Sequence, residues 1–237
     1  MCEIKIKVNC PHCHSAKVVK NGKKANGSQN FLCKACGKQF QLEYRYRGCD
    51  IKVKHLIISM LLRNSGVRDI CIILRVSDYL VGKCLLSEAK KCECMPKKSS
   101  YASVQIDEFW SYVGKKKQGK RWIIYAYCPQ TQTILAYVIG KRDIKTVKKL
   151  YKKLKKLKIA AYYTDNWKAF ANVLKKENHI VGKQGTKHIE GVNNSFRARN
   201  RRFVRKTTCF SKKDRYHEAA FAILVRQRNR DEGCHTF

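Results

Sequence analysis

Acidic residues are scarce in this 237-residue sequence. Only 17 Asp and Glu stand against 52 Lys and Arg, which gives a formal net charge of +35. So basic a protein attracts polyanions, and nucleic acid is the natural partner. Proline is also rare, with 3 residues, while 44% of the residues are hydrophobic. This composition excludes a disordered basic tail and indicates a folded protein that displays its charge on its surface.

Long hydrophobic runs are lacking as well. No stretch approaches the roughly 18 apolar residues of a membrane span. The first ten residues alternate charged and apolar side chains and contain no signal-peptide run. We therefore expect a soluble, cytoplasmic protein without a membrane partner.

Cysteine, by contrast, is plentiful. The 13 cysteines are an odd number, and without a secretory signal they favour a metal site and reduced thiols over a disulfide framework. Two C-x2-C pairs near the amino terminus have the spacing that holds tetrahedral zinc. We predict a structural Zn²⁺ ion bound by Cys10, Cys13, Cys33 and Cys36. Four unligated thiols are the alternative, and His12 and His14 could substitute as ligands.

The chain divides into four segments. Residues 1–48 contain the cysteine pairs and are predicted to be a zinc ribbon, and residues 49–92 a helix-turn-helix DNA-binding module. Residues 93–101 are predicted to be a linker and residues 102–237 a catalytic domain. Cys92, just before the linker, and Cys94, within it, form a close pair. Helical spacing of apolar residues predicts three helices in the second segment, the last capped by Ser77, over Lys52–Arg63, Val67–Arg75 and Asp78–Lys90. A plain helical or dimerising segment is the alternative to the helix-turn-helix.

The last segment alternates strand and helix patterns. Three β-branched and aromatic runs are followed by an amphipathic helix, a short apolar strand and two more helical segments. The runs are 101–114, 121–128 and 133–141, then Asp143–Lys158, Ile159–Thr164, Ala169–Lys176 and Ile189–Arg202. This order predicts an α/β fold with a ribonuclease-H-like mixed sheet flanked by helices.

Two acids end predicted strands in a chain that has few acids. Asp107 and Asp165 each follow apolar strand residues, and burying an uncompensated carboxylate is costly, so a bound cation best explains them. Glu190, at the start of a predicted helix, is the candidate third ligand. The structural alternatives are a salt-bridged strand acid, a helix cap and a solvated helix acid, respectively. Glu108 is expected to point to the opposite face of its strand and to be solvated.

A basic run follows the third acid. Six cations and no acid occur within ten residues: Arg197, Arg199, Arg201, Arg202, Arg205 and Lys206. These side chains are predicted to bind the phosphate backbone of DNA, and a solvated charged face is the alternative. Trp110, Trp122 and Trp167 are expected to pack in the core or on the sheet rather than to stack on bases.

Several strings of this sequence resemble the transposase family of insertion sequence 1. They are VQIDEFWSYVG (104–114), KRWIIYAY (120–127), YYTDNW (162–167), TKHIEGVNNSFRARNRRFVRK (186–206) and FSKK (210–213). The amino-terminal NCPHCHS and FLCKACGKQF resemble the zinc-ribbon region of the same family. The order and the spacing of these strings carry the resemblance, which extends over almost the whole chain.

The resemblance implies a metal-dependent DNA transposase with an acidic (DDE) triad. Asp107, Asp165 and Glu190 would bind catalytic Mg²⁺ or Mn²⁺, and Arg197 would contact DNA beside them. The partners would be double-stranded DNA, at the element ends and at the target, and further copies of the chain in a synaptic homo-oligomer associated with the nucleoid. A non-catalytic zinc-ribbon and helix-turn-helix regulator is one alternative function. A hydrolytic nuclease of the same fold, which cuts without joining, is the other.

Overall fold

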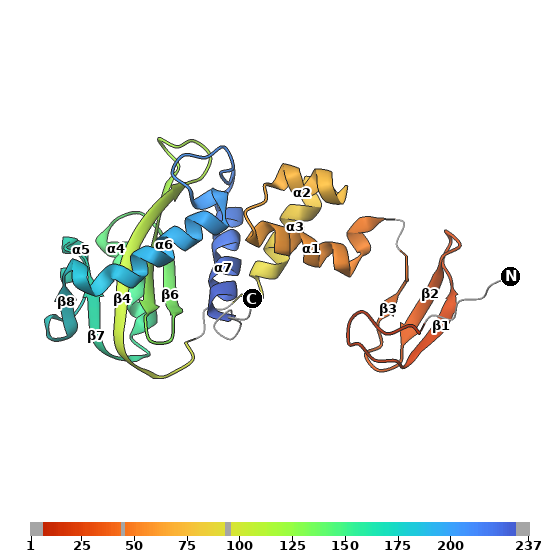
Figure 1. Cartoon of the computed structure of the whole chain (residues 1–237), viewed down its shortest axis with the longest axis horizontal. Helices are drawn as coiled ribbons and strands as arrows, with labels where there is room; N and C mark the ends of the chain where they lie inside the picture. Colours follow the sequence, from red (N-terminus) through yellow and green to blue (C-terminus); the bar gives the residue numbers. More distant parts are fainter. Residues whose placement is uncertain (1–6, 44–45, 93–95, 231–237) are drawn as a thin grey trace.

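The structure is a computed structural model that describes residues 7–43, 46–92 and 96–230 (Figure 1). Three parts follow one another along the chain: a small sheet, a group of three helices, and a larger sheet with helices on both faces. The mixed sheet and the preceding cysteine-bearing sheet confirm the predicted fold class.

The small sheet is stabilised by a minimal core. Its three antiparallel strands are β1 (Val18–Lys23), β2 (Gln29–Cys33) and β3 (Gln39–Phe40). Phe31 and Phe40 stack at a ring-centroid distance of 5.7 Å, next to the buried Cys10 and Cys33. Two aromatic rings bury too little apolar surface to stabilise a sheet of this size alone, so a small domain of this kind needs a further cross-link such as a metal.

The three helices agree closely with the sequence prediction. They are α1 (Ile51–Leu62), α2 (Val67–Leu74) and α3 (Asp78–Ala89), and the short 3-10 helix η1 (Arg47–Cys49) precedes them. The Ser77 hydroxyl accepts a hydrogen bond from the Leu80 amide at 3.2 Å and so caps α3 as predicted. The Asp50 carboxylate caps α1 in the same way, accepting from the Lys52 amide at 2.8 Å.

The large sheet has five strands in the spatial order β6-β5-β4-β7-β8. They are β4 (Ser100–Tyr112), β5 (Lys120–Cys128), β6 (Thr133–Gly140), β7 (Lys158–Thr164) and β8 (His179–Val181). β5 is antiparallel to both of its neighbours, β4 and β6, whereas β4, β7 and β8 run parallel to one another. The long central strand β4 begins within the segment that the sequence predicted as a linker.

Helices cover both faces of this sheet (Figure 1). Val104, Ile106 and Ile124 lie in the core under α4 (Ile144–Leu154) and α5 (Lys168–Ala171). Phe109 and Tyr125 lie in the core on the opposite face. That second core also contains residues of α6 (Lys187–Arg199), the 3-10 helix η4 (Arg201–Phe203) and α7 (Asp214–Arg230). Two further 3-10 helices are η2 (Lys176–Asn178) and η3 (Lys183–Thr186).

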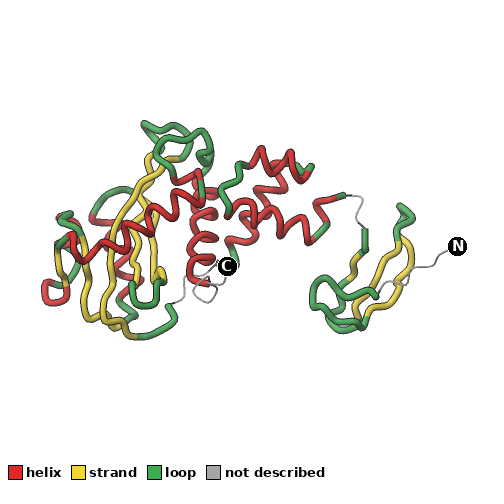
Figure 2. The backbone as a smooth tube through the Cα atoms, in the orientation of Figure 1, coloured by secondary structure: helices red, strands yellow, loops and turns green. Residues whose placement is uncertain are grey.

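The helical module shares its core with the large sheet. Leu80 and Leu85 of α3 belong to the same hydrophobic cluster as Phe109 of β4 and Phe221 of α7. Figure 2 shows α7 between the sheet and the three helices. At this junction Arg226 of α7 donates to Glu88 of α3 at 2.6 Å. Segments 49–92 and 102–237, which remain predicted domains, are therefore packed together by one continuous core.

Some helix predictions were wrong in length. α4 ends at Leu154 rather than at Lys158, because β7 begins at Lys158. α6 ends at Arg199 rather than at Arg202, because Asn200 turns the chain and caps η4. In 169–176, only the short α5 is α-helical. Of the close cysteine pair, Cys92 lies 3.8 Å from the Arg226 guanidinium, and Cys94 lies outside the described residues.

The sequence prediction missed α7. Residues Ala219–Val225 are buried without interruption, since the helix is enclosed by β6 and α3. A helix buried on all sides has no apolar stripe of period 3.6, and that stripe is the signal on which helix prediction depends.

Candidate active site and metal centres

The predicted acids Asp107 and Asp165 meet near the middle of the large sheet. Strands β4 and β7 are parallel, and Gln105 is opposite Tyr163 in their register. Two residues beyond this pair come Asp107, still on β4, and Asp165, just after β7. One carboxylate oxygen from each of these acids, and one from Glu108, lie within 4.8 Å of one another. The fold thus gathers three acids in a chain that has few.

Asp107 is held by two hydrogen bonds. Its Oδ1 accepts from the Glu108 amide at 2.8 Å, and its Oδ2 accepts from Asn193 Nδ2 at 2.8 Å. Burial raises the pKa of the Asp107 carboxyl, and the charges of Asp165 and Glu190 raise it further, against the two hydrogen bonds. A negative charge here is therefore fixed in position but electrostatically disfavoured, which is the environment that a bound cation relieves.

The prediction that Glu108 is solvated was wrong. Its side chain is 4% exposed, and its Oε1 accepts from both Nε and Nη2 of Arg142, at 2.9 and 2.6 Å. Burial raises the pKa of the Glu108 carboxyl to about 7, although the hydrogen bond from Arg142 opposes the shift. Strand alternation does place Glu108 on the α4 face, but the segment before α4 brings Arg142 over it and excludes water.

Glu190 approaches from the helix rather than from the sheet. It lies in the first turn of α6 and is exposed, and its charge contributes to the raised pKa of Asp107. Among the described residues, Glu190 is not part of the carboxylate group gathered within 4.8 Å. Its role as the third acid remains a prediction.

Two neutral amides that the sequence did not single out join α6 to the sheet. The Oε1 of Gln105 on β4 accepts a hydrogen bond from the Ile189 amide at 2.9 Å, which satisfies a free N–H of the first turn of α6. Asn193 links Asp107 to the buried Tyr125, whose hydroxyl donates to Asn193 Oδ1 at 2.8 Å. Amides leave no sequence signal, so only the structure could identify them.

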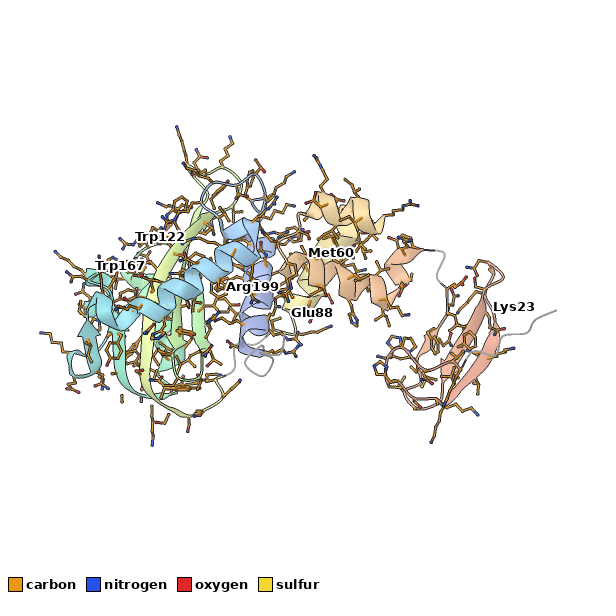
Figure 3. The ribbon with its side chains drawn as sticks, viewed as in Figure 1. Lys23, Met60, Glu88, Trp122, Trp167 and Arg199 are labelled. Carbon is orange, nitrogen blue, oxygen red and sulfur yellow. The ribbon has the colours of Figure 1, made fainter. Side chains whose placement is uncertain are left out.

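The predicted DNA-binding cations have different environments. Arg197 is half-buried, with its Cζ 5.6 Å from the Phe109 ring centroid, and burial lowers its pKa. Arg202 is only 8% exposed and burial lowers its pKa too, so its burial weighs against direct contact with DNA. Arg199 is half-buried at the end of α6 (Figure 3). The exposed members of the run are Arg201, Arg205 and Lys206.

A basic hollow lies beside this run. Its volume is about 710 Å³, and Arg201, Lys206 and Lys116 line it together with Asn64 from the turn after α1. The hollow therefore borders both the helical module and the end of β4. Three cations around one opening give it the charge that a phosphate backbone requires.

The three tryptophans form a strip with cations on their rings. Trp110 and Trp122 are opposite each other on β4 and β5, and all three tryptophans are half-buried. The Arg142 guanidinium contacts two of them, 5.1 Å from the Trp122 centroid and 4.5 Å from the Trp167 centroid. Such contacts fix the orientation of a guanidinium. The expected sheet-packing role of the tryptophans therefore includes holding Arg142.

The four predicted zinc ligands come together in the small sheet. The sulfur atoms of Cys10 and Cys36 are 3.7 Å apart, and those of Cys13 and Cys33 are 3.6 Å apart. Zn–S bonds of about 2.3 Å in a tetrahedron separate two sulfurs by about 3.8 Å, whereas a disulfide needs about 2.05 Å. The cluster thus fits a zinc ion with four thiolates, as predicted.

Comparison of the sequence with known protein families identifies the family of this chain. The family model described as IS1 transposase matches residues 101–229. The family model of the InsA N-terminal domain, a zinc ribbon, matches residues 4–37. The chain belongs to the IS1 transposase family. The predicted resemblance is confirmed, and a single chain contains both the InsA-type ribbon and the transposase region.

Named relatives agree with this membership in the IS1 family. The chain is 35% identical to the insertion element iso-IS1n protein InsB of Shigella dysenteriae, over 51% of this chain and 92% of that protein. It is 34% identical to the IS1 protein InsB of Shigella flexneri, over 48% and 86%, and 30% identical to an InsB protein of Escherichia coli K12, over 60% and 84%.

One solved structure resembles the chain weakly. A chain in the simian T-cell lymphotropic virus intasome with the PP2A regulatory subunit B56 gamma aligns at a TM-score of 0.36 and 10% identity, over 72% of this chain and 65% of that chain. So low a score says nothing about the site of the IS1-family chain.

In the described ranges, every helix is too short or too polar to cross a membrane.

Proposed function

We propose that this IS1-family chain binds the ends of an insertion element and catalyses metal-dependent cleavage and transfer of DNA strands. The convergence of the Asp107, Glu108 and Asp165 carboxylates within 4.8 Å is the observation that carries the proposal. A zinc-ribbon and helix-turn-helix regulator would need no such cluster. The wide distribution of the +35 net charge along the chain also favours a DNA substrate.

Asp107, Asp165 and Glu190 are the residues proposed to hold the catalytic ions. Their oxygen donors suit Mg²⁺ or Mn²⁺, and a cation would relieve the repulsion that the charges of Asp165 and Glu190 exert on the largely buried Asp107. When bound, such ions supply an activated oxygen nucleophile and relieve charge on the leaving oxygen.

The protein's own side chains would orient the site. Asn193 holds Oδ2 of Asp107 and the Glu108 amide holds Oδ1, so the carboxylate is fixed beside the neighbouring acids. Gln105 fixes the first turn of α6 and thereby the position of Glu190. Arg197, seven residues after Glu190, is two helical turns along the same face, where its guanidinium would bind a phosphate of the DNA end.

Exposed cations would bind the remaining DNA. Arg201, Arg205 and Lys206 lie around or beside the basic hollow and would contact phosphates, while α1–α3 and the zinc ribbon would contribute to recognition of the element end. Joining two ends requires at least two copies of the site, so a homo-oligomer on nucleoid DNA is part of the proposal.

The test is a strand-cleavage and strand-transfer assay with labelled element ends, a plasmid target and Mg²⁺. We expect Asp107→Asn, Asp165→Asn and Glu190→Gln to abolish both reactions, while the exposed-acid control Glu177→Gln keeps them. Active, well-folded Asn variants would remove the catalytic assignment. Cleavage without joining in the wild type would favour the hydrolytic nuclease.

A further inference from the structure

Glu108 has an unused oxygen beside the proposed catalytic acids. Both contacting nitrogens of Arg142 bind the same carboxylate oxygen, Oε1. An arginine fork commonly engages both oxygens of a carboxylate. Here Oε2 is buried and has no hydrogen-bond partner among the described residues. Burying a carboxylate oxygen without a hydrogen-bond donor costs free energy. A cation bound to Oε2 would offset this cost.

The one-sided contact has a structural cause. Arg142 contacts the Trp122 and Trp167 rings, which fixes the plane of its guanidinium. The Glu108 side chain is 4% exposed, so bulk solvent hardly reaches the oxygen that lacks a donor. The remaining direction open to Glu108 is toward Asp107 and Asp165, whose oxygens lie within 4.8 Å of its carboxylate.

We propose that Glu108 is a direct ligand of the metal centre, alongside Asp107 and Asp165, and that Arg142 holds it in place through Oε1. This inference rests on the proposed metal-dependent function and adds a fourth carboxylate to the expected acids. Oxygens of one Mg²⁺ ion are at most about 4 Å apart, so a small side-chain movement brings the three acids onto one ion. Two ions about 3.5–4 Å apart would also be within reach.

Metal binding tests the inference without requiring catalysis. The full-length, zinc-loaded protein is titrated with Mn²⁺, and the free ion is measured by electron paramagnetic resonance. We expect Glu108→Gln to weaken Mn²⁺ binding about tenfold or more, the effect typical of losing a coordinating group or its immediate support. The exposed control Glu177→Gln should bind Mn²⁺ as the wild type does.

A second variant separates ligation from general electrostatics. Glu108→Asp keeps the negative charge and a partner for Arg142 but withdraws the carboxylate by one methylene. Direct ligation predicts weaker Mn²⁺ binding for this variant too, at an unchanged thermal midpoint in metal-free buffer. If Glu108→Asp binds Mn²⁺ like the wild type, or if Glu108→Gln does, the inference is overturned.

Asp107→Asn and Asp165→Asn tell this failure apart from failure of the proposed function. If these variants lose Mn²⁺ binding while the Glu108 variants keep it, the metal centre exists without Glu108. If all of them bind Mn²⁺ like the wild type, metal-dependent catalysis at this site is itself wrong.

Discussion

Asn193 Nδ2 on α6 donates a hydrogen bond to Asp107 Oδ2 on β4 over 2.8 Å. The two residues are 86 positions apart in the sequence. Asn193 is itself buried and oriented by the Tyr125 hydroxyl. Helix, amide and strand therefore act together to hold one carboxylate oxygen of the proposed metal centre.

Replacing Asn193 by alanine should change the pH dependence of the reaction. The hydrogen bond from Asn193 lowers the pKa of Asp107, so without it the pKa rises further and the carboxylate charges only at higher pH. We expect the acid limb of the rate profile to move to higher pH and Mg²⁺-dependent cleavage at neutral pH to fall about tenfold or more. Cleavage rates measured over a pH series give both values. The exposed neighbour variant Asn194→Ala is the control, and identical profiles for the two variants would refute a positioning role.

Loss of one zinc ligand should release the metal. Cys10→Ser leaves three thiolates for a site that needs four, so the bound zinc should fall from about one per chain to nearly zero. Zinc is measured by atomic absorption after extensive dialysis. Cys49→Ser changes an exposed cysteine outside the cluster and should keep the metal. Zinc retained by Cys10→Ser at the wild-type level would contradict the four-cysteine site.

The exposed part of the basic run should determine the salt dependence of DNA binding. Each phosphate contact contributes about 0.9 to the slope of log K against log salt. Replacing Arg201, Arg205 and Lys206 by alanine should therefore reduce the slope by up to about 2.7. Fluorescence anisotropy at several salt concentrations measures it. The control replaces three exposed lysines of α4, Lys148, Lys149 and Lys152; an equal loss of slope in both variants would show that the run is not a specific contact.

His217 should make folding stability depend on pH. It is buried on α7, with Nε2 2.9 Å from the Ser111 hydroxyl, and burial lowers its pKa to about 4 from 6.5. The fold holds this histidine neutral, whereas the unfolded chain takes up the proton as the pH falls below 6.5. The contribution to stability is therefore complete above pH 6.5 and is lost as the pH falls to 4.

The matching variant removes that pH dependence. Between pH 7.5 and pH 5 the wild type should lose about 2 kcal/mol from this group, and His217→Gln should lose less, whatever its stability at pH 7.5. Urea unfolding at pH 7.5 and pH 5 measures the difference. The exposed histidine variant His55→Gln should follow the wild type. A His217→Gln protein with the wild-type pH slope would show that other groups cause the loss.

Local patterns predicted the parts of the fold that depend on local interactions. Helices α1, α2 and α3 were predicted to within one residue at each end, because periodicity and caps are local. The meeting of Asp107 and Asp165 could be predicted because apolar strands precede both acids. Asn193, Gln105 and the Glu108–Arg142 pair were not, since each depends on a contact between segments distant in sequence. Strand alternation gives the direction of Glu108 but cannot reveal what covers that face.

The continuous core from α3 through α7 to β4 has a consequence for the DNA. If α1–α3 read bases and the acids cut a phosphate, a packed joint fixes the length of duplex between the two points. B-DNA turns once in about 10–10.5 base pairs, so one inserted base pair rotates the cut site by about 35° relative to the bases that are read. The shared core would resist that rotation. The number of base pairs between the bases that are read and the phosphate that is cut would then affect cleavage as much as the sequence of the element end does.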